Sequence, residues 1–331
     1  MAGRRQKKSG GRSYAWRYRG RIVACVFVEM IIICALVIMI GWNKGVKEWF
    51  EQFEQPVLKE VDISGINSPN AILMQARGGK ILGEINGEAQ IYPASMTKIM
   101  TVILGIENFD DLDEKITLTN EMFSGLYEQD ATQAGFQPGE EVRVIDLLYG
   151  GMLPSGAECC IALADTISGS ETDLAELMNK KARKLGMENT HFCDSTGLHN
   201  PAHYSTVKDI AVLMKYCIKN DTFREIVETS RHSTGVTNIH PDGITYYSTM
   251  FKNLSDPTVT GGKILGGKTG YTSEAGHCLV SFAEIEGREY IFVSAGASGA
   301  DGNTIPHIQD AVTVYNRVGA AIEAKMNNNN K

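Results

Sequence analysis

The first residues that could carry out a reaction are Ser95 and Lys98, in the run Ser95-Met96-Thr97-Lys98 at the start of a predicted helix. Residues three apart share one face of a helix, so the hydroxyl and the amine can meet. A serine hydroxyl is a poor nucleophile without a base, and a lysine amine can be that base when burial or a second cation lowers its pKa. The run alone is weak evidence, because Ser-x-x-Lys also arises where a serine caps a helix.

A second run, Lys268-Thr269-Gly270, follows two further glycines at positions 266 and 267. Glycine within a strand lets a ligand approach the backbone closely. A lysine and a threonine beside such glycines can hold a carboxylate. Taken alone, this run is better explained by a surface hairpin with glycines at a bulge.

A third run, Ser155-Gly156-Ala157, begins an apolar segment with helical spacing. On its own it indicates a helix start, with Ser155 close to the N-cap. The three runs together resemble the set Ser-x-x-Lys, Ser-x-Asn and Lys-Thr-Gly of serine β-lactamases and penicillin-binding proteins, in the same order. The combination is more specific than any one of its members.

The composition limits the classes of protein to which this chain can belong. The chain has 331 residues, 43% apolar and 21% charged, which excludes a disordered polymer, a collagen-like repeat and a small disulfide scaffold. Five of its seven cysteines lie beyond the apolar N-terminal stretch, so at most two disulfides can form there. Residues 1–21 hold eight basic and no acidic side chains, which leaves 24 basic and 39 acidic residues elsewhere. We expect no nucleic-acid partner for so acidic a body.

Residues 22–42 form the one stretch that is long and apolar enough to span a membrane. The basic residues before it favour a cytoplasmic N-terminus, with the body outside the cell. No clear small-x-small cleavage site follows, so we expect an uncleaved single-pass anchor rather than a signal peptide. The predicted layout is a basic cytoplasmic tail at 1–21, a transmembrane signal-anchor at 22–42, a stalk at 43–67, a compact domain at 68–325 and a disordered tail at 326–331.

The elements that must position the three runs follow from hydrophobic periodicity. Strands are predicted at 70–75, 80–85, 263–271, 278–285 and 289–296, and helices at 95–107, 144–149, 157–167, 171–185, 206–219 and 308–325. We expect the 206–219 helix to be opened by Ser205, with a possible capping box from Thr206 to Asp209. The order predicts an α+β fold, in which both ends of the chain complete one sheet around a helical insertion.

Longer blocks extend the resemblance over residues 68–318, almost the whole predicted domain. The blocks at 91–101, 147–164, 178–186, 195–199, 203–206 and 267–276 resemble low-molecular-mass penicillin-binding proteins that act as serine-type D-alanyl-D-alanine carboxypeptidases. The resemblance implies a three-layer fold of the β-lactamase/transpeptidase type, with an antiparallel sheet, flanking helices and a helical subdomain. It also implies a bacterial cell membrane location and neither a cofactor nor a metal.

The resemblance implies three catalytic residues. Ser95 would attack the carbonyl of the penultimate D-alanine of a peptidoglycan stem peptide and form an acyl-enzyme. Lys98 would take the serine proton, and Ser155 would relay a proton to the departing D-alanine. Water would then release the shortened peptide. β-Lactam antibiotics would acylate Ser95, because they resemble the acyl-D-Ala-D-Ala end.

The resemblance also implies a substrate-binding strand. Lys268 and Thr269, with Gly270 beside them, would bind the terminal carboxylate of the substrate. The backbone N–H groups of Ser95 and Tyr271 would form an oxyanion hole. Such a donor is typically worth about 10²–10³ in rate.

One position departs from the family pattern and supports a different function. Ala157 stands where the family usually has Asn, and it cannot make a side-chain hydrogen bond to the substrate amide. We expect Ala157 to line the site and to weaken or retune catalysis. It is the one feature that supports the alternative of a catalytically weak sensor that binds muropeptides or β-lactams.

Two further alternatives receive less support. A β-lactamase needs a fast deacylation base, and the candidate pair Glu176 and Asn179 falls on a predicted helix. A zinc peptidase lacks the compact His-Glu-x-x-His motif. Its ligands would have to come from His191, Asp194, His199 and His203.

Overall fold

The computed structural model describes Met30 and residues 58–254, 256–299 and 305–329. Contacts divide the chain into two units, Met1–Pro56 and Val57–Lys331, and the second unit holds the elements below. The predicted cytoplasmic tail, the span at 22–42 and the stalk up to residue 57 lie outside the described residues, apart from Met30. Within the described ranges, no helix is both long and apolar enough to cross a bilayer.

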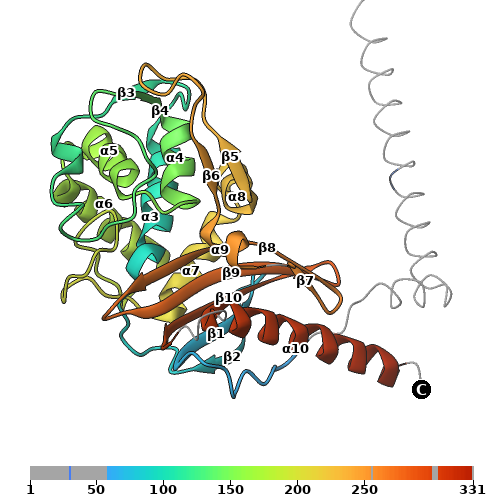
Figure 1. Cartoon of the computed structure of the whole chain (residues 1–331). Helices are drawn as coiled ribbons and strands as arrows, with labels where there is room; N and C mark the ends of the chain where they lie inside the picture. The colour runs from blue at the N-terminus through green and yellow to red at the C-terminus, as the bar shows by residue number, and fades with distance from the viewer. Residues whose placement is uncertain (1–29, 31–57, 255, 300–304, 330–331) are drawn as a thin grey trace, which may run out of the picture. The chain divides into compact units, whose positions relative to one another are not determined.

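A six-stranded antiparallel sheet is built from both ends of the domain, which confirms that prediction (Figure 1). Its order is β2-β1-β10-β9-β8-β7, and β1 pairs with β10 so that Ile72 lies opposite Val293. The strands are β1 Asn70–Gln75, β2 Ile81–Ile85, β7 Thr258–Val259, β8 Gly262–Thr272, β9 Gly276–Ile285 and β10 Arg288–Ala297. Because β7 pairs only with the start of β8, the rest of β8 is an edge to which another backbone can add.

The two faces of the sheet bury different side chains, because successive residues of a strand point to opposite sides. Ile72 and Val293 lie in a core shared with the inserted helices. Leu73 and Phe292 lie in a second core with α10, the helix Pro306–Asn329 that covers the other face (Figure 1). The three layers are therefore the inserted helices, the sheet and α10, which confirms the predicted α+β class.

The segment between β2 and β7 is mostly helical (Figure 1). Its helices are η1 Ala94–Thr97, α3 Lys98–Asn108, η2 Glu121–Phe123, α4 Val144–Met152, α5 Ala157–Ser168, α6 Glu171–Leu185, α7 Val207–Cys217, α8 Asp221–Glu228 and α9 Thr249–Asn253. Two short strand pairs lie among them: β3 Lys115–Thr117 with β4 Glu141–Arg143, and β5 Arg231–Ser233 with β6 Thr245–Tyr247. Helices α8 and α9 were not predicted.

Local side chains set the ends of the predicted helices. Ser170 accepts a hydrogen bond from the Asp173 amide at the start of α6, and Gly186 ends that helix with a φ of +80°. Thr206 rather than Ser205 is the N-cap of α7, where it accepts from the amide of Asp209.

Two predicted boundaries differ from the structure. The domain begins ten residues earlier than predicted: Leu58, Val61 and Ile63 are buried in the second core, and the Val61 amide donates to the Leu82 carbonyl over 2.7 Å. The predicted disordered tail is helical as far as Asn329. Extending an existing helix adds a hydrogen bond for each residue that becomes ordered, so α10 tolerates a run of weak helix formers.

Candidate active site

The hydroxyl of Ser95 lies against the amine of Lys98. Ser95 sits in the 3₁₀ turn η1, and Lys98 is the first residue of α3. Lys98 Nζ donates to Ser95 Oγ over 2.9 Å and to the carbonyl of Thr196 over 2.8 Å. The predicted helix thus begins with a tighter turn, but the pair meets as the spacing predicts.

The environment of Lys98 makes its amine a base. The side chain is 3% exposed, and burial lowers its pKa because the charged form loses its hydration. The nearby thiols and the carboxylates of Asp194 and Glu158 act in the opposite direction and limit the fall. An amine with a lowered pKa spends more time neutral, and only the neutral form can accept the serine proton.

The backbone around Ser95 is strained and closely packed. Ala94 has a φ of +47°, a conformation that costs a non-glycine residue about 1–3 kcal/mol. Two glycines make room for this turn. A Cβ on Gly197 would lie 1.9 Å from the Ala94 carbonyl oxygen, and one on Gly270 would lie 3.0 Å from the Ser95 amide nitrogen. Gly270 therefore brings strand β8 next to the nucleophile.

A second serine–lysine pair faces the first. Lys268 Nζ donates to Ser155 Oγ over 2.9 Å and to the Thr269 carbonyl over 2.8 Å. Lys268 is 1% exposed, and burial, followed by the nearby charge of Lys98, holds its pKa well below the usual range. Ser155 lies next to the N-cap of α5, as its run indicates, because Gly156 occupies that position. Ser155 adopts a strained φ of +73°.

These groups converge on a cavity of about 390 Å³. Its lining includes Ser95, Ser155, Thr269, Gly270 and Tyr271, all of which were predicted as site residues. The two lysines lie beneath the serine hydroxyls. Thr269 Oγ1 is 2.6 Å from Thr249 Oγ1, a lining residue that the motifs did not indicate. The cavity therefore presents hydroxyls over two buried amines.

Ala157 was predicted to line the site. The residue is 1% exposed and is not among the residues that line the cavity. Its amide donates to the carbonyl of Thr132 over 2.8 Å, and Thr132 is a lining residue, so Ala157 lies directly behind the cavity wall. Its effect on catalysis stays a prediction.

A buried acid and histidine support the nucleophile and were missed as a group. Asp194 accepts hydrogen bonds from the amides of Thr196 and Gly197 over 2.7 and 2.6 Å, which orients the carbonyl that holds Lys98. His203 joins Asp194 to Thr97, with 3.1 Å on one side of the ring and 2.9 Å on the other. Burial opposes ionisation of Asp194, but these hydrogen bonds and the His203 charge lower its pKa to about 2.

The residues considered for zinc make other contacts. His191 Nδ1 lies 2.7 Å from the Ala202 carbonyl, and His199 lies 3.8 Å from the Glu274 carboxylate. Among the described residues, no group of three or more His, Cys, Asp or Glu could hold a metal ion. The five described cysteines, Cys159, Cys160, Cys193, Cys217 and Cys278, are free thiols.

Comparison with known proteins agrees with this geometry. Residues 57–299 match the family model described as D-alanyl-D-alanine carboxypeptidase. The chain is 34% identical to D-alanyl-D-alanine carboxypeptidase DacF of Bacillus subtilis over 69% of this chain and 57% of the relative. It is also 34% identical to the D-alanyl-D-alanine carboxypeptidase of Streptomyces sp. strain K15, over 69% of this chain and 78% of that protein.

Solved structures show the same fold. The crystal structure of Streptomyces K15 DD-transpeptidase superposes with a TM-score of 0.70 at 29% identity, and covers 79% of this chain and all of that one. The chain spans less than two thirds of the length of several of its curated relatives, including DacF. The match to the family model extends over more than half of this chain, and the chain belongs to the D-alanyl-D-alanine carboxypeptidase family.

Proposed function

We propose that this protein is a serine D,D-carboxypeptidase that removes the terminal D-alanine from peptidoglycan stem peptides. The observation that carries the proposal is the 2.9 Å contact between Ser95 Oγ and the amine of Lys98, which is buried and has a lowered pKa. The names of the relatives support the same substrate. The family membership and the site geometry thus support one reaction.

The reaction begins at Ser95. Its Oγ attacks the carbonyl carbon of the penultimate D-alanine while its proton passes to Lys98 Nζ. The tetrahedral intermediate collapses to an acyl-enzyme when the bond to the terminal D-alanine breaks. The leaving amine takes the proton of Ser155, whose hydroxyl is held by Lys268. Ser155 in turn regains a proton from the charged amine of Lys98, which becomes neutral again. Water then attacks the ester while its proton passes through Lys98 to Ser95, which releases the shortened peptide and restores the serine hydroxyl.

The strand β8 orients the substrate in this proposal. Lys268 and Thr269 attract the terminal carboxylate, and the exposed edge of β8 pairs with the peptide backbone. The amides of Ser95 and Tyr271 form the oxyanion hole, for which the close approach of Gly270 to the Ser95 amide is favourable. β-Lactams carry a carboxylate and an acyl group in a similar relation, so we expect them to acylate Ser95.

Release of free D-alanine tests this function. The full chain is incubated with a peptide that ends in Lys-D-Ala-D-Ala, and Ser95→Ala serves as the control. We expect release from the unsubstituted protein and none from the variant. No release from protein shown to be folded would overturn the carboxypeptidase proposal. Retained penicillin binding in that case would support the sensor alternative.

We propose in addition that residues 22–42 anchor the chain in the bacterial cell membrane, with residues 1–21 in the cytoplasm and the catalytic domain outside. Support comes from the apolar run and the eight basic residues before it. Protease added to intact spheroplasts should digest the domain and leave an N-terminal tag protected. Protection of the domain would contradict this orientation.

A further inference from the structure

Two stacked histidines form one wall of the reaction cavity. The rings of His277 and His307 lie 5.0 Å apart and within 7° of parallel, and both residues line the cavity. His307 is 3% exposed, and its Nδ1 is buried without a hydrogen-bond partner among the described residues. An unpaired buried polar atom destabilises the folded state, so this arrangement favours a ligand that supplies the missing partner.

The strand register places this pair on the carboxylate side of the cavity. Thr269 and Tyr271 point to the same face of β8, because side chains alternate along a strand. Tyr271 is paired with His277 of β9, and the two rings lie 4.7 Å apart. Lys268 points to the opposite face, towards the serines. The histidines therefore share a face with Thr269, beside the position proposed for the terminal carboxylate.

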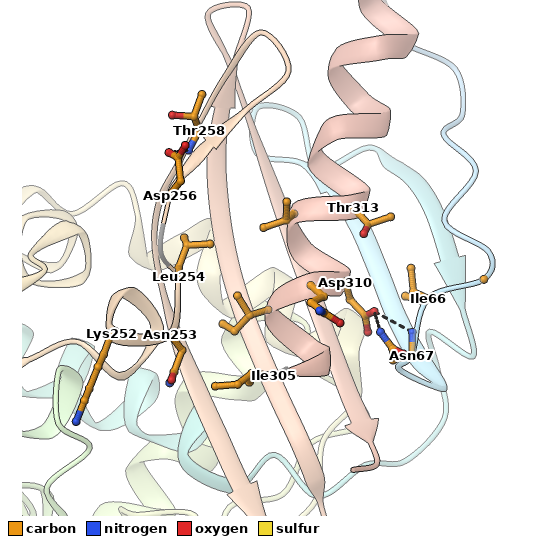
Figure 2. A pocket seen from close by; sticks show the side chains of 14 residues that line it. Ile66, Asn67, Lys252, Asn253, Leu254, Asp256, Thr258, Ile305, Asp310 and Thr313 are labelled. Atoms are coloured by element: carbon orange, nitrogen blue, oxygen red, sulfur yellow. Dashed lines mark hydrogen bonds between the residues drawn. The ribbon is translucent and has the colours of Figure 1, made fainter. Parts of the chain in front are cut away.

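The charge of Asp310 raises the pKa of His307, but its effect is smaller than those of burial and of His277. Asp310 follows His307 by one helical turn, and its carboxylate oxygens accept hydrogen bonds of 2.8 Å from the backbone amides of Asn67 and Ser68. Figure 2 shows the contacts between Asn67 and Asp310 in a separate hollow. This hollow has a volume of about 810 Å³ and shares only the lining residues Asn253 and Ile305 with the reaction cavity.

The remaining charged and titratable groups around the pair are few. Lys268 lies across β8 from the histidines, Asp130 lines the same cavity, and the ring of Tyr271 contacts that of His277 at a tilt of 34°. His307 is also the second residue of α10, where the helix N-terminus favours a negative charge. The arrangement is suited to an anion that enters with the ligand.

We propose that His277 and His307 are a second, protonation-dependent anchor for the free carboxylate of the substrate or of a β-lactam. The inference rests on the proposed function and deepens it, because it names the residues that select a free C-terminal acid. The imidazole pair takes up a proton as the carboxylate binds, and the charged pair then holds the anion beside Thr269.

The sign of the pH dependence follows from linkage. Burial, with repulsion from His277, lowers the pKa of His307 to about 4, so the empty site is neutral at neutral pH. A bound carboxylate raises that pKa. Binding therefore strengthens as pH falls from the ligand-bound pKa towards about 4, by at most about tenfold per pH unit for one proton.

A ratio of substrates selects the pH dependence that comes from the free carboxylate. The value of kcat/KM is measured from about pH 5 to about pH 8 for an acyl-D-Ala-D-Ala peptide and for its C-terminal amide. Lys268 also faces the carboxylate and contributes to this ratio, so the share of the histidines is measured with the variants below. We expect the ratio of acid to amide to rise as pH falls. A ratio that does not change with pH would overturn the proposal.

Variants of His307 test whether the pH dependence of the acid-to-amide ratio comes from the nitrogens of its ring. His307→Phe keeps an aromatic ring in the stack and should lower the ratio by about 10-fold or more at low pH, through KM rather than kcat. His307→Gln keeps a neutral donor, and its ratio should depend less on pH than that of the unsubstituted protein. His191→Gln changes a histidine outside the cavity and should behave as the unsubstituted protein. Acylation by a penicillin methyl ester reports whether each variant retains an intact site. An unchanged ratio in both His307 variants would overturn the proposal.

A binding measurement separates this inference from the proposed function. In full-length Ser95→Ala protein with labelled histidine, NMR follows the imidazoles during a pH titration with and without acetyl-D-Ala-D-Ala. We expect the dipeptide acid to raise the His307 pKa and the dipeptide amide to leave it unchanged. This outcome would hold even if no D-alanine were released. Identical titrations with both peptides would overturn the histidine anchor and leave the carboxypeptidase proposal standing.

Discussion

The region around Ser95 and the region around Ser155 have the same local plan and different electrostatics. In each, a buried lysine donates to one serine hydroxyl and to one backbone carbonyl. Lys98 lies near carboxylates, which favour its charged form, whereas the charge near Lys268 is that of Lys98, which disfavours it. Similar hydrogen bonds thus accompany unequal pKa shifts.

This difference indicates how the protonation states of the two amines are linked. Because they repel each other when both are charged, they titrate as a coupled pair rather than as separate groups. A substrate carboxylate beside Lys268 favours the charged form of Lys268. Through repulsion it also favours the neutral form of Lys98. Under the proposed mechanism, substrate binding beside Lys268 would therefore favour the neutral form of Lys98, so the two regions would act together.

The largest expected effect is on the nucleophile. Ser95→Ala removes the one hydroxyl that the amine of Lys98 contacts, so acylation should fall by about 10⁶-fold. A fluorescent penicillin followed by gel electrophoresis and peptide mapping measures this loss, and circular dichroism checks the fold. Label that persists at Ser155 would show that the roles of the two serines are reversed.

Removing the base should have the next largest effect. Lys98→Met keeps most of the side-chain volume but not the amine, and should slow acylation by about 10²–10⁴-fold. Stopped-flow measurement of penicillin acylation gives this rate, with exposed Lys180→Met of α6 as the matched control. If Lys98→Met acylates at nearly the normal rate, Lys98 is not the base.

A smaller effect should appear in the pH profile of acylation. Asp194 favours the charged form of Lys98, so Asp194→Asn should lower the Lys98 pKa and move the rising limb of the profile to lower pH. Asn can still accept one of the amide hydrogen bonds, which should limit the fall in maximum rate to about tenfold. Asp165→Asn changes a partly exposed residue of α5 and serves as the control. It should leave the rising limb of the pH profile in place. A shift to higher pH would contradict this account of Lys98.

The smallest effect on catalysis is expected at Ala157. Ala157→Asn puts a larger polar side chain into a fully buried position, which should lower the free energy of unfolding by about 1–3 kcal/mol. Because the residue is not part of the cavity lining, kcat/KM should change by less than about threefold. Denaturant unfolding and D-alanine release measure the two quantities. A large gain in activity at unchanged stability would restore Ala157 to the site.

Much of the fold was predictable because its signals are local. The strands and main helices follow from the period of apolar residues, and the cap at Thr206 and the stop at Gly186 follow from short side-chain rules. The start of the compact domain at Leu58, earlier than predicted, could not be predicted from such local signals. That segment has no strong period, and it is ordered by burial against residues distant in the chain.

The two serine–lysine pairs of the site also differ in whether local sequence signals predict them. Lys98 follows Ser95 by three positions, so helical geometry alone brings them together. The contact between Ser155 and Lys268 crosses 113 positions, and only the resemblance to a family indicated that they belong to one site.

The amino-acid order was therefore sufficient to predict the contact between Ser95 and Lys98, the sheet built from both chain ends and the family. Folding alone produced the lowered pKa values of the lysines, the covered position of Ala157 and the stack of His277 on His307. The reason is physical. The spacing of residues along the chain determines which groups can lie close together within one helix or strand. Desolvation and the repulsion between charges depend on what the rest of the chain packs around those groups.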